Sequence, residues 1–249
     1  MHPEPNQGHR ALIWDLPVRV FHWLFALTIT GALVIVFAGP DESPTFGWHA
    51  VLGLTAAAMA AWRVVWGWLG TRYARFGAMR YGPSDIIGYF AGVVAGRDTR
   101  HVGHNPGSVV AIGLMVLCAL ALAATGLALG LGNGGIKEIH EILAWGMLAA
   151  VGLHLAGLAV HTIRFRENIA ASMVHGHKFA TAESAIDSPR TAAGVGLLVA
   201  AVACLMLLSA GLGSAGTTLR LPGLGATLRI GDADHGEHEP GEASERDDD

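Results

Sequence analysis

The stretch that decides the fold is residues 14–37, WDLPVRVFHWLFALTITGALVIVF. It is long enough to cross a bilayer core of about 30 Å as a helix. After Arg19, the one titratable side chain in this stretch is His22. An imidazole in hydrocarbon is costly unless a partner holds it. His22 is therefore either a functional ligand or a structural histidine bonded to a neighbouring helix, and the other histidines must decide between these two interpretations.

The composition predicts an integral membrane protein. Of 249 residues, 52% are hydrophobic and only 14% are charged, against a charged fraction of about 25% in soluble domains. Long apolar runs predict five transmembrane helices, at residues 17–38, 46–69, 108–131, 138–163 and 191–213. We expect an all-α fold with three parts: a transmembrane domain at 1–178, a linker and fifth helix at 179–213, and a disordered acidic tail at 214–249.

The distribution of charge predicts the orientation. Residues 231–249 hold nine acids and one arginine, so the rest of the chain is net positive. Eleven lysines and arginines lie before the first apolar run, in its first turn, or in the two long loops at 70–106 and 164–190, whereas the two short loops hold only Lys137. The positive-inside rule places the N-terminus and the long loops in the cytoplasm. With five crossings, the C-terminus is expected outside.

Two further features concern the membrane surface. Residues 83–97, PSDIIGYFAGVVAGR, predict a short surface helix with Ser84 or Asp85 as its N-cap. Tryptophans at the ends of the first two apolar runs are expected to lie in interfacial belts; these are Trp14, Trp23, Trp48, Trp66 and Trp68.

Four histidines fall at two depths of this predicted bundle. His22 lies near the cytoplasmic end of the first helix, and His49 near the outer end of the second. The fourth helix carries His140 near its outer end and His154 fourteen residues later. Fourteen residues rise about 21 Å and turn nearly four full times, so both imidazoles project from nearly one face. Depth therefore predicts the pairs His22 with His154 and His49 with His140.

Two facing imidazoles suit the axial positions of a haem iron. A zinc site would need more protein ligands, and neither pair has a cysteine or acid inside the membrane. The sequence has no C-x-x-C-H, which excludes covalent c-type haem attachment at such a motif. Glycines on these helices, among them Gly31, Gly53, Gly146, Gly152 and Gly157, would admit either a neighbouring helix or a flat macrocycle.

The chain resembles the bacterial cytochrome b561 and nickel–iron hydrogenase b-type cytochrome subunit family over about residues 12–178. The resemblance rests on WDLPVRVFHW, WHAVLGL, WRVVWGWLG, GHNPGS, IHEILAW, LHLAG and RENIAASMVHGHK. It implies a four-helix bundle holding two b haems through His22, His49, His140 and His154. A fifth helix and an acidic tail depart from the family pattern.

The resemblance also implies quinone chemistry beside the cytoplasmic haem, at His104, Asn105 and Gly107 in GHNPG. The same residues are a good turn and helix-start signal, and both interpretations stay open. Arg19 and Arg63 are candidates to pair with haem propionates, and snorkelling to the membrane surface explains them equally well.

The sequence thus predicts a dihaem b-type cytochrome of the bacterial inner membrane, part of a respiratory chain. It would pass electrons between the quinone pool and an outer redox protein, such as a c-type cytochrome or a dehydrogenase or hydrogenase subunit. Its expected contacts also include membrane lipid and, as an open alternative, a second copy of the chain, and they exclude nucleic acid. A divalent-metal transporter that uses the histidines as a relay is one rival; a non-redox membrane anchor is another.

Overall fold

The computed structural model describes residues 9–40, 43–97 and 100–231. Its elements, in chain order, are β1 (His9–Leu12), α1 (Leu16–Ala38), η1 (Pro44–Phe46), α2 (Gly47–Leu69), η2 (Phe76–Met79), α3 (Pro83–Ala95), α4 (Pro106–Gly130), η3 (Gly134–Ile136), α5 (Lys137–Phe165), η4 (Ile169–Ala171), α6 (Ser172–His175), β2 (His177–Ala180), η5 (Ala182–Ser184), α7 (Thr191–Ala210), β3 (Thr218–Arg220) and β4 (Thr227–Arg229). Helices dominate, and five of them, α1, α2, α4, α5 and α7, are long and apolar enough to cross a membrane.

The five predicted transmembrane helices are confirmed, each within a few residues. Two of the long helices, α1 and α4, begin at side-chain N-caps. Asp15 caps α1 by accepting from the Val18 N–H at 2.8 Å, with Pro17 in the first turn. Asn105 caps α4, with Pro106 at the first helical position. Proline is favoured there because its missing N–H has no partner in a helix anyway.

The helices pack in a chain of neighbours rather than a closed ring. The close pairs among the long helices are α1 with α2, α2 with α4, α4 with α5, and α7 with both α1 and α2. Within the described residues, the α5 backbone makes no comparably close approach to α1 or α2. Only Met147 and Ala150 of α5 are buried. Met147 lies seven residues from both His140 and His154, on nearly the same face, so the histidine face of α5 is directed into the protein.

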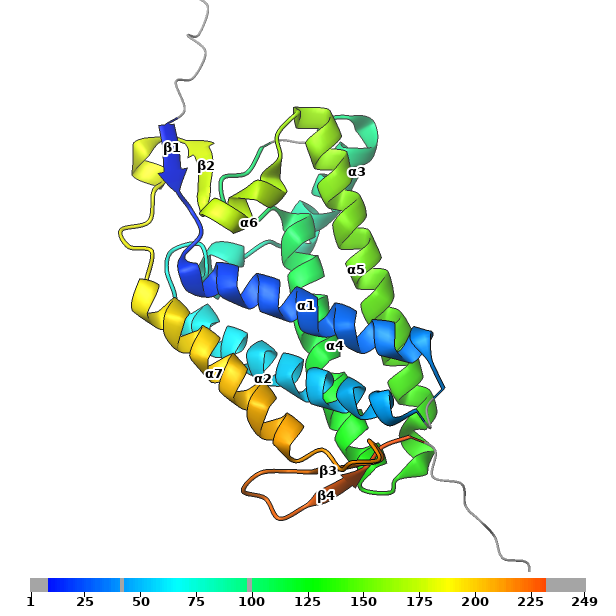
Figure 1. Cartoon of the computed structure of the whole chain (residues 1–249). Helices are drawn as coiled ribbons and strands as arrows, with labels where there is room; N and C mark the ends of the chain where they lie inside the picture. Colours follow the sequence, from blue (N-terminus) through cyan, green and yellow to red (C-terminus); the bar gives the residue numbers. More distant parts are fainter. Residues whose placement is uncertain (1–8, 41–42, 98–99, 232–249) are drawn as a thin grey trace, which may run out of the picture.

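The two ends of the bundle carry different small elements (Figure 1). We call the end with β1, β2, α3 and α6 the loop side, and the end with β3 and β4 the hairpin side. On the loop side, β1 pairs antiparallel with β2, which joins the residues before α1 to those after α6. Under this ribbon lies a small core that includes Ile13, Trp14 and Ala74.

The hairpin side corrects one expectation. Part of the tail predicted to be disordered, from residue 214, is ordered: β3 pairs antiparallel with β4. Leu219 and Leu228 are buried there against Val51 of α2 and Leu208 of α7. One buried leucine on each strand gives this segment its apolar contact with the bundle. The acidic stretch from 232 onward lies outside the described residues.

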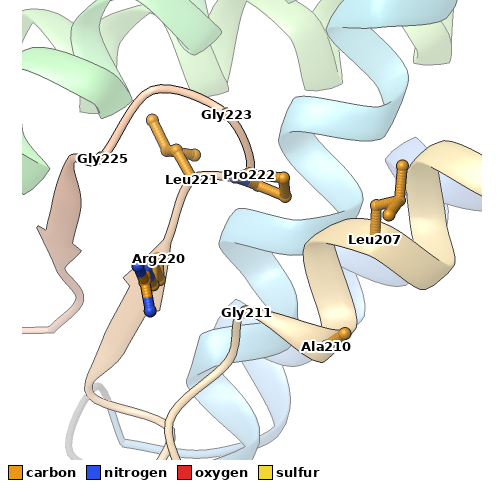
Figure 2. Close-up of a pocket in the computed structure, with 8 residues that line it drawn as sticks. All are labelled: Leu207, Ala210, Gly211, Arg220, Leu221, Pro222, Gly223 and Gly225. Atoms are coloured by element: carbon orange, nitrogen blue, oxygen red, sulfur yellow. The ribbon is translucent and has the colours of Figure 1, made fainter.

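A shallow cavity separates the hairpin from α7. Figure 2 shows it between the last turn of α7, with Leu207 and Ala210, and the loop that joins β3 to β4. Arg220 is its one charged lining residue. The approach of the hairpin to the bundle depends on Gly216, which has a φ of +73° and lies directly against the Pro44 carbonyl, where a Cβ would clash.

The predicted surface helix exists as α3, but its cap differs from the expectation. Gly82 is the N-cap and Pro83 the first helical residue. Asp85 lies at the third position, where its carboxylate accepts from the Gly82 N–H at 2.8 Å. Ile87, Phe90 and Val94 of α3 are exposed. Proline is better suited to the first position than Ser84, which explains the shift of the start.

Two predicted belt tryptophans are also interior. Trp14 is buried, and its Nε1–H donates to Ser172 Oγ at 3.0 Å. Trp66 donates to Asp15 at 3.1 Å. Trp23, Trp48 and Trp68 are exposed, as belt residues are.

Candidate haem and quinone site

The structure brings His49 and His140 together near the hairpin side. Their ring centres are 6.3 Å apart and their planes are inclined by 72°. A metal–imidazole bond is about 2 Å long and a ring nitrogen lies about 1 Å from its ring centre, so two rings that share one metal ion have centres about 6 Å apart. The spacing of this pair fits an iron between the two imidazoles.

The hydrogen bonds of this pair determine which nitrogen of each imidazole ring carries the proton. His49 Nδ1 is 3.0 Å from the Ala32 carbonyl oxygen, which can only accept, so Nδ1 carries the proton. His140 Nδ1 is 2.8 Å from Thr125 Oγ1. The Thr125 hydroxyl already donates to carbonyls of its own helix, so it accepts from His140. Both histidines therefore keep an unprotonated Nε2, the form that binds a metal.

The second pair, His22 and His154, lies deeper toward the loop side. Both side chains are half-buried. His22 Nδ1 is buried and has no hydrogen-bond partner. A buried imidazole nitrogen without a partner is unfavourable. The unpaired nitrogen of His22 therefore indicates that this part of the bundle is built to hold a further group.

The glycines of these helices fall into two groups: one lies against a neighbouring helix, and the others have open space around them. A Cβ on Gly31 would lie 2.9 Å from the Leu52 side chain, so Gly31 serves ordinary packing of α1 on α2. Gly53, one turn after His49, would meet nothing within 4 Å. The same holds for Gly146, Gly152 and Gly157 on α5. The open space at Gly53 lies on nearly the same face of α2 as His49 and fits a flat macrocycle, whereas Gly152 and Gly157 are exposed and carry no such indication.

A buried ionic network lies under the loop side. Asp15 is fully buried: besides capping α1, its carboxylate accepts from Thr71 Oγ1 at 2.7 Å and from Trp66 Nε1. Arg63 is also buried, feels the Asp15 charge, and has its guanidinium carbon 6.0 Å from the Phe76 ring centre. One terminal nitrogen of Arg63, Nη1, is buried without a partner. Arg63 is therefore an interior cation with spare donor capacity, not a side chain snorkelling into water.

Arg19 has a different environment. One of its terminal nitrogens donates to the Val174 carbonyl beside α6, while its Nε is buried and has no partner. Trp23, one turn later on α1, donates to the Met173 carbonyl at 3.0 Å. Arg19 therefore fastens α1 to α6 and retains one buried donor.

The GHNPG loop has a clear structural role. Asn105 Oδ1 accepts from both the backbone N–H and the hydroxyl of Ser108, at 2.7 and 2.9 Å, so the carbonyl end of this amide is occupied as the cap of α4. Gly107 makes room for α3, since a Cβ there would lie 2.7 Å from the Tyr89 ring. The amide NH₂ of Asn105 is the part of this motif that the cap does not use.

His104 packs against Trp14, with ring centres 4.6 Å apart. Burial lowers the pKa of His104 to about 3, and the positive charges of Arg63 and Lys178 contribute to the same shift. At neutral pH this imidazole is uncharged. It can donate or accept a hydrogen bond, but it does not hold an extra proton as a cation at neutral pH. A role of His104 in quinone binding is therefore limited to hydrogen bonding by the neutral ring.

Within the residues that the structure describes, no three histidine, cysteine or acidic side chains come together. A divalent-metal transporter would gather such ligands along its path, so this arrangement disfavours that rival. Asp15 and Thr125 were not identified from sequence. An aspartate before a Leu-Pro helix start signals a cap, but nothing local reveals its contacts with Thr71 and Trp66.

Fold and site together define a multi-pass membrane protein with interior histidines that face one another. A model of the prokaryotic cytochrome b561 family matches residues 13–176. This chain belongs to that family, so it is a bacterial membrane cytochrome that uses b-type haem in electron transfer. The fifth helix, α7, and the hairpin lie outside the matched region.

Two relatives carry the same description, "Probable Ni/Fe-hydrogenase B-type cytochrome subunit". The protein from Rhizobium leguminosarum bv. viciae is 27% identical over 210 residues, which cover 67% of this chain and 87% of the relative. The protein from Rhodobacter capsulatus is 22% identical over 214 residues, covering 67% and 80%. No solved structure matches the chain significantly.

Proposed function

We propose that this cytochrome holds two b haems and carries electrons across the membrane between quinone and a redox protein outside. The observation that carries the proposal is the His49–His140 pair, whose ring spacing and occupied Nδ1 atoms leave two Nε2 atoms for one iron. His22 and His154 would hold the second haem. A b haem supplies one-electron chemistry at its iron; the protein supplies ligands, spacing and local polarity.

The positions of the proposed ligands define the path of the electrons across the membrane. The two histidines of α5 are separated by about 21 Å of helix rise, which spans most of a 30 Å hydrocarbon core. Arg63, with its unpaired buried Nη1, is suited to a haem propionate on the loop side. Arg19 is the second candidate, through its Nε. Thr125 and the Ala32 carbonyl orient the ligands of the other haem.

The side on which the redox protein would bind is inferred from charge. The arginines of the loop side favour a cytoplasmic location for that end of the bundle, and the hairpin side would then face outward. The names of the two relatives favour a nickel–iron hydrogenase as the outer partner. A c-type cytochrome or another dehydrogenase would meet the same surface, and a second copy of the chain remains an alternative partner.

The function is tested by counting haems and reducing them with quinol. Acid-acetone extraction of the purified protein is expected to release about two haem b per chain by the pyridine haemochrome assay, because no covalent attachment motif exists. A short-chain quinol is expected to reduce both haems. One haem per chain, or haem that resists extraction, would contradict the dihaem assignment; colourless protein would favour a non-redox anchor.

We place the quinone beside GHNPG on the loop side, where Asn105, His104 and Gly107 lie at the start of α4. Asn105→Ala removes both the helix cap and the free NH₂, whereas Asn105→Asp keeps an oxygen for Ser108 and removes only the NH₂ donor. If this NH₂ binds a quinone carbonyl, both variants lose quinol-dependent reduction by about five- to tenfold, consistent with about 1 kcal/mol for one hydrogen bond.

Dithionite reduction and haem content serve as controls in both variants. Normal quinol kinetics in Asn105→Asp, with loss of stability confined to Asn105→Ala, would reduce the motif to a helix cap. Loss of haem in both variants would also contradict a role limited to quinone binding.

A further inference from the structure

The segment that follows α2 carries a cationic cavity that the electron-transfer role does not use. It has a volume of about 360 Å³ and is lined by Arg72, Arg75, Gly77 and Ala78. It opens just beyond Leu69, the last residue of the α2 span. A cavity at this level lies where lipid headgroups meet the protein.

The two arginines are held in place by backbone carbonyls rather than by acids. Arg75 Nε donates to the Gly70 carbonyl at 2.7 Å. Arg72 Nη1 donates to the Glu183 carbonyl at 3.2 Å, and its guanidinium carbon lies 5.4 Å from the Tyr73 ring centre. In the described part of the chain, neither guanidinium has a carboxylate within salt-bridge distance. Both cations are oriented by these carbonyls, and the described residues supply no counter-ion to either of them.

Exposed apolar side chains end the α2 span three to four residues before Arg72, the first residue that lines the cavity. Trp68 and Leu69 are 73% and 71% exposed. The Trp68 ring packs edge-on against Phe76, with centres 5.7 Å apart. Exposed tryptophan at the end of a span is typical of the bilayer interface. The charged and apolar parts therefore match the two parts of a phospholipid.

We propose that this cavity binds the phosphodiester headgroup of an anionic phospholipid such as phosphatidylglycerol. Arg72 and Arg75 bind the phosphate, for which the planar guanidinium is well suited, and Trp68 and Leu69 contact the acyl chains. An anionic lipid is favoured over a zwitterionic one, because the cavity has two cations and no acidic side chain in its lining to receive a choline or ethanolamine.

The test is lipid retention by the full-length holoprotein in neutral detergent, measured by native mass spectrometry. Phosphatidylglycerol and phosphatidylcholine with identical acyl chains are titrated in parallel. The wild-type protein is expected to bind phosphatidylglycerol at least about tenfold more tightly than phosphatidylcholine. In the double variant R72Q/R75Q this preference is expected to fall by about tenfold or more, because charge-assisted contacts to the phosphate are lost.

The matched control is R80Q/R97Q, which removes two exposed arginines from the same side of the membrane, outside the cavity lining. It is expected to change the affinity for phosphatidylglycerol by less than about twofold. The contrast with R72Q/R75Q arises because the charge-assisted contacts that set the affinity lie within the cavity. Equal losses in the two double variants would show nonspecific attraction and overturn the site.

A competition on the wild-type protein removes any dependence on how the variants fold. Free inorganic phosphate and glycerol phosphate are added to protein loaded with phosphatidylglycerol. Retention at concentrations that saturate a simple anion site supports a lipid site. Displacement by inorganic phosphate alone, or equal retention of phosphatidylcholine, overturns it.

Discussion

A His140→Ala variant is expected to lose one of the two proposed haems and to retain the other, and a His49→Ala variant is expected to lose the same haem. The two ring centres are 6.3 Å apart, and each ring keeps Nε2 for a metal because its Nδ1 is hydrogen-bonded. Removing either ligand leaves the iron with a single imidazole and the site with an open face. His22→Ala and His154→Ala are expected to remove the other haem. Pyridine haemochrome content and a redox titration of each variant measure which haem remains.

Thr125 supplies a graded version of the same experiment. Thr125→Val removes the acceptor of the His140 Nδ1–H while nearly preserving side-chain volume, and loss of such an orienting partner typically costs about ten- to a hundredfold in metal affinity. Thr125→Ser keeps the hydroxyl and is expected to restore binding and the midpoint potential of that haem. If His22→Ala and His49→Ala lost the same haem, the pairing by depth would be wrong.

Asp15→Ala is expected to lower the free energy of unfolding by about 2–4 kcal/mol, because it removes a helix cap and leaves two donors without their acceptor. The substitution removes the cap of α1 and the acceptor for Thr71 and Trp66. Denaturant unfolding of the detergent-solubilised protein, followed by circular dichroism, measures the loss.

Asp85→Ala is the matched control, because Asp85 also supports a helix start but is exposed. It is expected to cost about 1 kcal/mol or less, as a surface cap does. Equal effects of the two substitutions would show that the Asp15 network adds nothing beyond capping.

Much of the architecture could be predicted from the sequence because the bilayer restricts the choice of fold. In hydrocarbon every backbone group must be bonded within its own segment, so an apolar run of about 20 residues indicates a helix, and the five spans followed directly. Histidine spacing on α5 follows from helix geometry alone, so pairing by depth was also within reach of the sequence.

The rest depended on contacts between residues far apart in the chain. The four-residue β1 has no pattern of its own and exists because β2, more than 160 residues later, pairs with it. The hairpin is ordered because Leu219 and Leu228 pack against Val51 and Leu208. No pattern in the local sequence predicts this contact.

The sequence by itself determined the class of protein, the number of spans and the histidines at each depth, because periodicity and hydrophobic length are local properties. Only the tertiary structure decided which nitrogen of His49 and His140 is hydrogen-bonded, since that depends on the Ala32 carbonyl and the Thr125 hydroxyl on neighbouring helices. It also decided that Asp15 is fully buried, because the burial of a side chain is fixed by what packs around it.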